Sequence, residues 1–498
     1  MTIKPRGPGR GGASRLKPKS EPPPDVNVDL KGSDNAVAVG PRSFAASVKV
    51  IFQGNWKPFA VVLGGVLATL FVILYFVIPK QTCAFSEQFT VAVAEFAVKD
   101  DAGKTIRSED GLNLAESIAG QIEAFFKEMR LEMDTSYEIC GPKQIGMIQT
   151  EDEAREFAIS KGASIIVYGQ IEKANGTSFF SPRFYVNQST FKDAEEITGQ
   201  HEIGKDVQGK SDVDIILAAS PGVQARVDGL SMLTVGLVYY SMDQFDKALA
   251  YFQKADHPDW VGSGKETVYL LIGNTYIRRA SKTKDFSILS EAERYYLLAM
   301  EDPDYGRAKI GEANVLYLRA YLENDCDPAG FQDAVDLLDE ASALEDQPAS
   351  ANIETKVHFY RGQIALMRFD CNLPGEDWAF VAENEFMWVA ARYEADAENE
   401  DAQSIQSFAA HAYARLSYLA YYKHNDVTSA IAFIQKAIPI SPMIYQANYL
   451  SQLGDMYVVI GEKDKAIESY RQAIIIANDF DAQSVSKYQK KLDSVLGP

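Results

Sequence analysis

The sequence contains only four cysteines and five histidines in 498 residues, and neither type is clustered. The closest pair of cysteines, Cys326 and Cys371, is 45 residues apart, and the histidines lack the spacing of metal ligands. No pairing of a serine or cysteine with a histidine has positional support as a catalytic triad. The sequence therefore predicts no catalytic residue, no metal site and no cofactor.

Basic residues are fewer than acidic residues after residue 80. Residues 1–80 carry a net charge of +7, whereas residues 81–498 carry −27 and the whole chain −20. Nucleic-acid binding requires clustered Lys and Arg, so the acidic body excludes that class of partner. The basic segment suits a position near anionic lipid. The acidity of the body is typical either of a soluble domain or of one that prefers basic partners.

Long apolar runs are absent, with one exception. Residues 59–78 contain no charge over 20 positions, and as a helix they would extend about 30 Å, the thickness of a bilayer's hydrocarbon core. Pro58 and Pro79 bound this run, so a transmembrane helix is predicted over residues 58–79. The run starts too far from the N-terminus for a cleaved signal peptide.

The flanking charges predict an orientation. Arg42, Lys49 and Lys57 precede the span, and only Lys80 follows it closely. The positive-inside rule therefore places the N-terminus in the cytoplasm and the C-terminal domains outside it. A stripe of small residues within the span could let two helices approach closely, which is one route to a homo-oligomer.

The segments before the span differ in composition. Residues 1–43 are rich in Pro, Gly and basic residues and are predicted to be a disordered arm, because they cannot bury enough apolar surface to fold. Residues 44–57 place Phe44, Val48 and Ile51 at helical spacing. This pattern predicts a juxtamembrane amphipathic segment.

A small α/β domain is predicted over residues 83–210. Apolar alternation indicates a strand near residues 89–98, and helical periodicity indicates helices over 112–129 and 151–161. A short strand is expected between these helices at residues 137–140, and an apolar strand at 164–171 and two amphipathic strands follow the second helix. The order β-α-β-α-β-β-β predicts a small sheet with helices on one face.

The same region resembles a known family. The segments Val-Ala-Val-Ala-Glu-Phe from Val91, Leu-Ala-Glu-Ser-Ile from Leu114 and Gly-Ala-Ser-Ile-Ile-Val-Tyr-Gly from Gly162 are similar to the amino-terminal domain of bacterial TolB. The resemblance covers about residues 88–205. It implies an interaction or assembly domain of the cell envelope, and it carries over no catalytic residue.

From about residue 228 the sequence repeats one pattern. An alanine is followed four residues later by a bulky residue, and three residues after that by a smaller one, so all three lie on one helix face. Six segments have this pattern: Ala248/Phe252/Ala255, Ala292/Tyr296/Ala299, Ala334/Leu338/Ala341, Ala382/Phe386/Val389, Ala430/Ile434/Ala437 and Ala466/Tyr470/Ala473.

Glycine and tyrosine lie three residues apart in several preceding helices, where the glycine should let a partner helix approach. The pairs are Gly236/Tyr239, Gly273/Tyr276 and Gly454/Tyr457. The last unit, from Leu453 to Ala473, closely resembles the tetratricopeptide repeat (TPR). The resemblance implies a mostly α chain whose residues 228–498 form a TPR-like α-solenoid that binds protein partners and ends in a capping helix.

The repeat period is irregular. The alanines are 36 to 48 residues apart, more than the 34 residues of a TPR in all cases. Surface inserts are therefore predicted at residues 281–290, 324–330 and 371–377.

One motif favours a different function. Residues Gly204–Ser211 fit the pattern G-x-x-x-x-G-K-S, in which backbone amides and a lysine bind nucleotide phosphates. That site also needs an apolar strand before the loop and a long helix after it. In this chain the preceding segment is polar, and Pro221 and Gly222 follow within about ten residues. An interdomain loop is the preferred interpretation, and a regulatory NTP-binding protein stays as an alternative.

The favoured function is a membrane-anchored scaffold or adaptor of the cell envelope that binds proteins through its solenoid and is not an enzyme. A structural subunit of a larger membrane complex is another alternative. If the C-terminal domains lie outside the cytoplasm, the cysteines can form disulfides. Cys326 and Cys371 occupy inserts of successive repeats and are the predicted pair, whereas a cytosolic location would leave four free thiols.

Overall fold

The computed structural model describes residues 83–85, 89–99, 103–129, 136–174, 177–191, 194–204, 207–209, 221–260, 262–323, 325–345, 347–348, 351–396, 401–480 and 484–497. All of them belong to the unit Gln81–Pro498. The predicted arm, juxtamembrane segment and transmembrane helix lie outside the described residues. Among the residues in these ranges, no helix is both long and apolar enough to cross a membrane.

Residues 89–209 form a mixed sheet with the strand order β3-β2-β5-β1-β4, and β6 pairs with β5, β7 and β8. β1 is parallel to β4 and β5, β2 is parallel to β5, and β6 is antiparallel to its three partners. The strands are β1 (Phe89–Val93), β2 (Ala97–Lys99), β3 (Thr105–Ile106), β4 (Tyr137–Cys140), β5 (Ile165–Ala174), β6 (Thr177–Val186), β7 (Gly199–Glu202) and β8 (Val207–Gly209).

Helices cover both faces of this sheet, so the prediction of helices on one face is wrong. In β1, Val91 and Val93 pack in one apolar cluster with α3 (Glu109–Met129), while Ala92 and Ala94 pack in another with α5 (Glu151–Lys161). The physical reason is that parallel strands are buried on both sides. The continuous burial of β1, including Thr90, is the pattern of such a strand.

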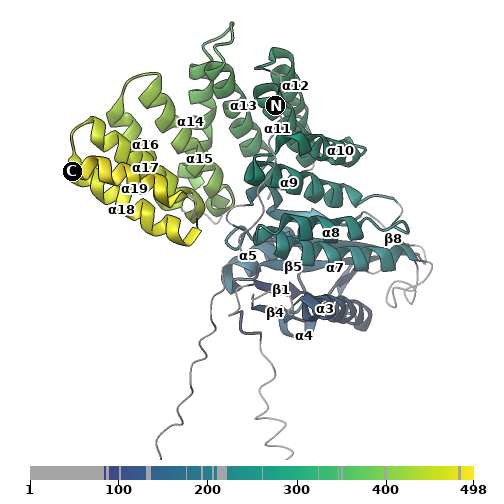
Figure 1. Ribbon diagram of the computed structural model, residues 1–498. Coiled ribbons are helices and arrows are strands. Elements are labelled where there is room, and N and C mark those ends of the chain that lie inside the picture. Colours follow the sequence, from purple (N-terminus) through teal and green to yellow (C-terminus); the bar gives the residue numbers. More distant parts are fainter. Residues whose placement is uncertain are drawn as a thin grey trace, which may run out of the picture. The chain divides into compact units, whose positions relative to one another are not determined.

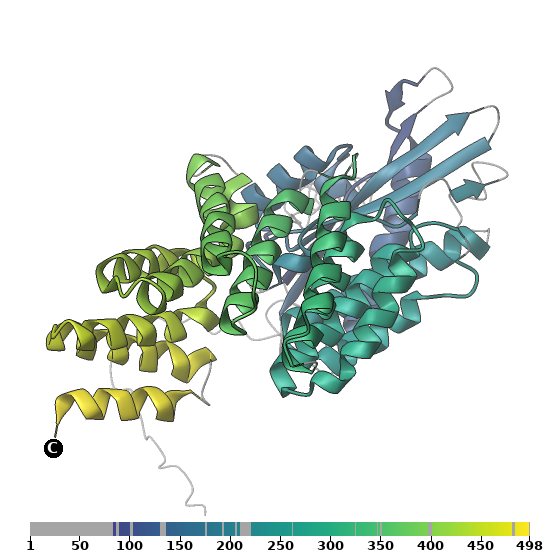
Figure 2. The same ribbon diagram turned by 90° about the horizontal axis from the view of Figure 1, so that it is seen from above.

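The rest of the described chain is helical, and Figure 1 shows its helices following one another in chain order. Six helix pairs are followed by one further helix, which forms the last layer in Figure 2. The helices are α7 (Pro221–Ser241) with α8 (Phe245–Ala255), α9 (Lys265–Thr283) with α10 (Leu289–Ala299), α11 (Gly306–Leu322) with α12 (Pro328–Ser342), α13 (Ile353–Asp370) with α14 (Trp378–Asp396), α15 (Asp401–Tyr422) with α16 (Val427–Ile440), α17 (Met443–Val459) with α18 (Lys463–Phe480), and α19 (Val485–Leu496).

The long repeat period comes partly from long helices. α9, α13, α14 and α15 have 18 to 22 residues. The segment predicted as an insert at 281–290 is largely helical, because α9 extends to Thr283 and a short 3-10 helix, η2 (Phe286–Ile288), precedes α10. The segments 324–330 and 371–377 lie at the turns within the third and fourth pairs.

The sheet and the first repeats share one apolar core. α3 packs against α7, and Phe126 and Phe184 belong to the same buried cluster as Tyr240 of α7 and Phe252 of α8. Helix α7 is apolar on nearly all faces, as expected for a helix enclosed by neighbours on every side. The α/β domain and the solenoid are therefore packed together, not merely linked.

Candidate functional site

The repeated side chains lie where paired helices touch. Ala248, Phe252 and Ala255 of α8 are completely buried. The equivalent residues of the other five pairs are also buried, namely Ala292, Tyr296, Ala299, Ala334, Leu338, Ala341, Ala382, Phe386, Val389, Ala430, Ile434, Ala437, Ala466, Tyr470 and Ala473.

Glycines in the first helices face these bulky side chains. A Cβ atom added to Gly236 would lie 2.4 Å from Phe252, and one added to Gly454 would lie 2.6 Å from Tyr470. Gly273 faces Tyr296 in the same way at 2.7 Å. These glycines thus lie where the two helices of the first, second and last pairs come closest.

The structure adds two glycines that sequence reasoning did not single out. A Cβ at Gly311 would lie 2.3 Å from Tyr296 of the preceding pair, and one at Gly362 would lie 2.7 Å from Phe386. The sequence does hold a signal for these two contacts, because each glycine lies inside a segment with helical periodicity. A glycine lowers helix propensity there, so its presence indicates a close contact that leaves no room for a side chain.

The tyrosines that accompany the predicted glycines pack beside these contacts. Tyr239 stacks on Tyr251 with ring centroids 5.4 Å apart. Tyr276 stacks on Tyr295 at 6.0 Å. The hydroxyl of Tyr457 accepts a hydrogen bond of 2.9 Å from Gln435.

A groove runs along the first helices of the last four pairs. Its walls come mainly from α11, α13, α15 and α17, with smaller contributions from α9 and α19, and its volume is about 750 Å³. Aromatic side chains dominate it: Tyr317, Phe359, Tyr360, Tyr418, Tyr421, Tyr422, Tyr445 and Tyr449. Such side chains offer rigid apolar surface with polar tips, which suits binding of a peptide segment.

Amide side chains lie between the aromatic ones. Asn314, Gln363, Asn448 and Gln452 line the groove, and none of them has a side-chain hydrogen bond within the described part of the chain. An amide offers both a donor and an acceptor, the same two groups that a peptide backbone presents. These four residues are therefore available to bind a main chain.

The charge of the groove is opposite to that of the chain. Arg415, Lys487 and Lys491 line it together with one carboxylate, Asp455. Lys491 lies 2.5 Å from Asp455. Arg415 is exposed and has no ion pair to any residue that the structure describes. Within the described part of the chain, the groove thus presents one cation without an ion pair, Arg415, on an acidic protein.

His411 is a neutral member of the groove. Burial, with a further contribution from the charge of Arg415, lowers the pKa of His411 to about 3. Its Nδ1 lies 2.7 Å from the hydroxyl of Tyr449. The imidazole is therefore uncharged at physiological pH and orients a tyrosine of the groove wall.

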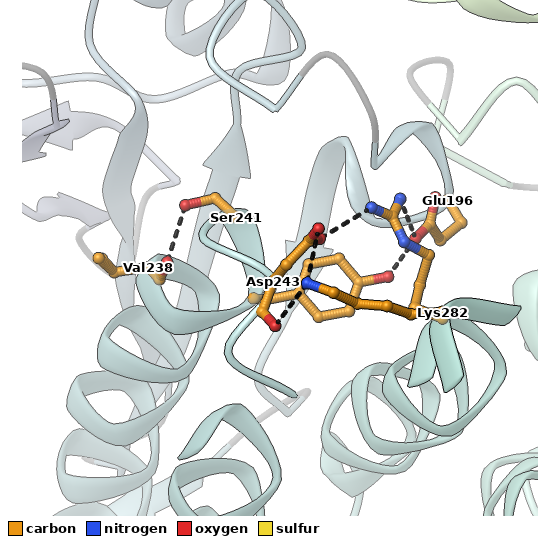
Figure 3. A network of polar contacts seen from close by, with 7 residues as sticks. Glu196, Val238, Ser241, Asp243 and Lys282 are labelled. Atoms are coloured by element: carbon orange, nitrogen blue, oxygen red, sulfur yellow. Dashed lines mark hydrogen bonds and ion pairs between the residues drawn. The ribbon is translucent and has the colours of Figure 1, made fainter. Parts of the chain in front are cut away.

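A second polar network joins the α/β domain to the repeats (Figure 3). Tyr240 donates to Glu196 of the 3-10 helix η1 (Glu195–Ile197), and Arg278 of α9 lies 3.7 Å from Glu196 and 3.4 Å from Asp243. Lys282 reaches Asp243 at 3.1 Å. The carboxylates of Glu196 and Asp243 balance the charges of Arg278 and Lys282. This network therefore connects α9 to the α/β domain without net charge.

Arg307 of α11 contacts the α/β domain differently. Its Nη1 lies 2.8 Å from Nε2 and 3.3 Å from Nδ1 of His201. The same Nε2 lies 2.8 Å from the carbonyl oxygen of Ile197. Burial first, and then the charge of Arg307, lowers the pKa of His201 well below its ordinary value. A neutral imidazole carries no charge, so His201 does not balance the charge of the guanidinium.

The motif at Gly204–Ser211 is only partly described, since Lys210 and Ser211 lie outside the described residues. Val207–Gly209 form strand β8, antiparallel to β6. Gly204 has φ +95°, and an added Cβ would lie 2.9 Å from the carbonyl oxygen of Ser263. A close approach of two loops explains this glycine without a phosphate.

The cysteines form two pairs. A disulfide joins Cys326 to Cys371, the pair favoured by their positions in successive repeats, and a second joins Cys83 to Cys140. The first links the turns of the third and fourth helix pairs. The second attaches the start of the described chain to β4.

Comparison with known families places tetratricopeptide repeats in this chain. The model of the Tetratricopeptide repeat family matches residues 231–256 and 447–480. These segments cover α8 with the second half of α7, and most of α17 with α18. No curated protein sequence matches the chain significantly.

Several solved structures resemble the chain weakly. A tetratricopeptide repeat protein from Parabacteroides merdae is 12% identical, covers 61% of this chain and 93% of its own length, and has a TM-score of 0.36. TTC0263, a TPR protein of Thermus thermophilus, is 15% identical over 53% of this chain and 98% of its own, with a TM-score of 0.26. Yeast Tom70 is 15% identical over 54% and 67%, with a TM-score of 0.20.

Proposed function

We propose that this chain is a membrane-anchored scaffold or adaptor of the cell envelope that binds segments of other proteins in the groove between α11 and α19, and that it is not an enzyme. The groove itself carries the proposal. Its aromatic walls, its four amides without side-chain partners and the unpaired Arg415 match the apolar, hydrogen-bonding and acidic parts of an extended peptide.

The membrane part of the proposal comes from the sequence. The uncharged run at residues 59–78 would anchor the chain, with the N-terminus in the cytoplasm and the repeats outside it. The similarity of residues 88–205 to the TolB amino-terminal domain supports a place in the cell envelope. An anchor would raise the concentration of bound partners near the membrane.

The test is partner capture by the full chain in its native membrane, by cross-linking and mass spectrometry. Arg415→Glu should abolish capture of a specific partner, because it inverts the charge that the groove offers. Arg471→Glu is the matched control, since Arg471 is exposed on α18 and does not line the groove. Capture that survives both Arg415→Glu and the double change Tyr360→Ala/Tyr445→Ala would rule out the groove.

A structural subunit of a larger membrane complex would behave differently in the same experiment. It would co-purify in a fixed stoichiometry with the same proteins whether or not the groove is altered. The groove variants therefore separate a peptide-binding adaptor from a subunit held by other surfaces.

A further inference from the structure

A small pocket beside the groove contains buried hydrogen-bond donors that lack acceptors. Its volume is about 140 Å³, and its polar lining comes mainly from Asn274 and Arg278 of α9, Arg307 and Asn314 of α11, and Lys356 of α13. Among the described residues, Glu196 is the only carboxylate in the lining. Donors and positive charges therefore outnumber acceptors in this pocket.

Two of these side chains are almost fully buried and incompletely paired. Arg307 and Asn274 are each 5% exposed. In the described part of the chain, Nη2 of Arg307 and Nδ2 of Asn274 have no hydrogen-bond partner. Asn274 is held with its amide nitrogen free, because its Oδ1 accepts a hydrogen bond of 2.6 Å from Tyr296.

No neighbouring carboxylate forms an ion pair with Arg307 in the described part of the chain, although the charge of Glu151 acts on the guanidinium from a greater distance. Glu196 is engaged by Tyr240 and Arg278, and His201 is neutral. No carboxylate that the structure describes lies within 4.0 Å of the guanidinium. A guanidinium stays charged even when buried, and a buried charge without a counter-charge is strongly unfavourable.

We propose that this pocket binds one small oxyanion, a carboxylate or phosphate group, that accepts hydrogen bonds from Arg307 and Asn274. Lys356, 4% exposed, adds positive charge to the same wall. Leu270, Ile277 and Ile310 form apolar parts of the lining. Apolar surroundings strengthen a charge-assisted hydrogen bond. The oxyanion supplies the counter-charge that Arg307 lacks.

The bound anion connects the two parts of the unit. It contacts α9 and α11 directly, and Arg307 in turn contacts His201 of the α/β domain. Anion binding therefore stabilises the junction between the sheet and the solenoid. This inference does not depend on the proposed function, because a free ion can occupy the pocket whether or not the groove binds a protein.

The oxyanion has two sources. It is either a free ion or the acidic group of a protein segment in the groove, because the pocket and the groove share Ile277, Asn314, Tyr360 and Tyr445 as lining residues. Three probes distinguish these sources: sodium phosphate, sodium acetate and N-acetyl-glycyl-glycine. Tighter binding of the peptide than of acetate assigns the site to a protein segment, and the reverse order assigns it to a free ion.

The experiment is thermal unfolding of the full chain in detergent at constant ionic strength, with chloride replaced by each probe. We expect a saturable rise in melting temperature with at least one probe, because a ligand of the folded state stabilises it by mass action. Arg307→Gln should abolish the rise, and Asn274→Ala should weaken binding roughly tenfold or more, the effect of losing a charge-assisted hydrogen bond.

Arg415→Gln is the matched control, since Arg415 lines the groove but not the small pocket. It should keep the full response to phosphate and acetate. If Arg307→Gln does not fold, Asn274→Ala provides the comparison. The inference is overturned if no probe gives a saturable rise in the unaltered chain, or if Asn274→Ala and Arg307→Gln respond as the unaltered chain does.

Discussion

Arg307 and Glu312 lie five residues apart on α11, and both are almost fully buried. Neither has an ion pair to a described residue. Burial, with a smaller contribution from Glu293, raises the pKa of Glu312 from 4.5 to about 8, against the opposing effect of Arg319. A carboxyl group can thus avoid a buried charge by keeping its proton. A guanidinium cannot do so, which is why Arg307 needs a counter-charge and a protonated Glu312 does not.

The raised pKa of Glu312 predicts a pH-dependent stability. The folded state holds this proton more tightly than the unfolded state, so the stabilisation is complete below about pH 4.5 and is lost as the pH rises to about 8. The glutamine of the Glu312→Gln variant cannot ionise. The free energy of unfolding of this variant, relative to that of the natural chain, should therefore rise by a few kcal/mol from pH 5 to pH 9, since one pKa unit corresponds to about 1.4 kcal/mol.

Denaturant unfolding at the two pH values measures this difference. Glu468→Gln is the matched control, because Glu468 is exposed on α18. The control should change stability equally at pH 5 and pH 9. A Glu312→Gln variant with the same pH dependence as the natural chain would mean that Glu312 is ionised in the fold.

At the scale of the element, the helix pair depends on one close contact. In four of the described pairs a glycine of the first helix faces an aromatic ring of the second, and in the last pair hydrogen bonding holds that ring in place. Tyr470, for example, is 2% exposed and donates a hydrogen bond of 2.7 Å to Asp455. Helices with larger residues at the glycine position would be forced apart, and each repeat is stabilised mainly by its neighbours.

Gly454→Ala should therefore destabilise the last helix pair, although alanine is the better helix former. The added Cβ would lie 2.6 Å from Tyr470, and overpacking of this kind costs about 1–3 kcal/mol. Amide hydrogen exchange should accelerate first in α17, α18 and α19, because a solenoid loses structure locally.

Gly120→Ala is the control for this prediction. Gly120 lies inside α3, and a Cβ there would meet no atom within 4 Å. That change should stabilise the chain by about 0.5–1 kcal/mol through helix propensity alone. If both variants gained stability, the glycine contact would not limit the approach of α17 and α18.

For the whole molecule, the predicted topology and the disulfides depend on each other. Structural disulfides persist in oxidising compartments and are rare in the cytosol. The pairs Cys326–Cys371 and Cys83–Cys140 lie in the described unit. The topology that we propose from the charges around residues 58–79 would put this unit outside the cytoplasm.

We therefore expect protease added to cells with a permeabilised outer barrier to digest residues 81–498 and to spare the arm. Mass spectrometry of non-reduced peptides from the native membrane should recover both cysteine pairs. Digestion of the arm alone would reverse the topology, and free thiols in that material would contradict the pairing.

The sequence by itself determined the elements whose signal is local. A spacing of four and three residues places side chains on one helix face whatever surrounds the helix, so the repeated triplets from Ala248 to Ala473 predict paired helices. The glycine contacts were predicted in part for the same reason. The sequence did not predict that helices cover the second face of the sheet. The apolar residues of β1 indicate that the strand is buried, but they do not indicate which helix packs on which face.

The tertiary structure alone decided the groove and the small pocket. Tyr317 and Tyr449 are 132 residues apart in the chain, and they share a wall only because successive helix pairs stack with a small rotation. Arg307 has no unusual neighbour in the sequence, and its missing counter-charge becomes visible only when His201, Glu196 and Asn274 are brought around it. Contacts of this kind depend on the packing of distant elements, and no local periodicity encodes them.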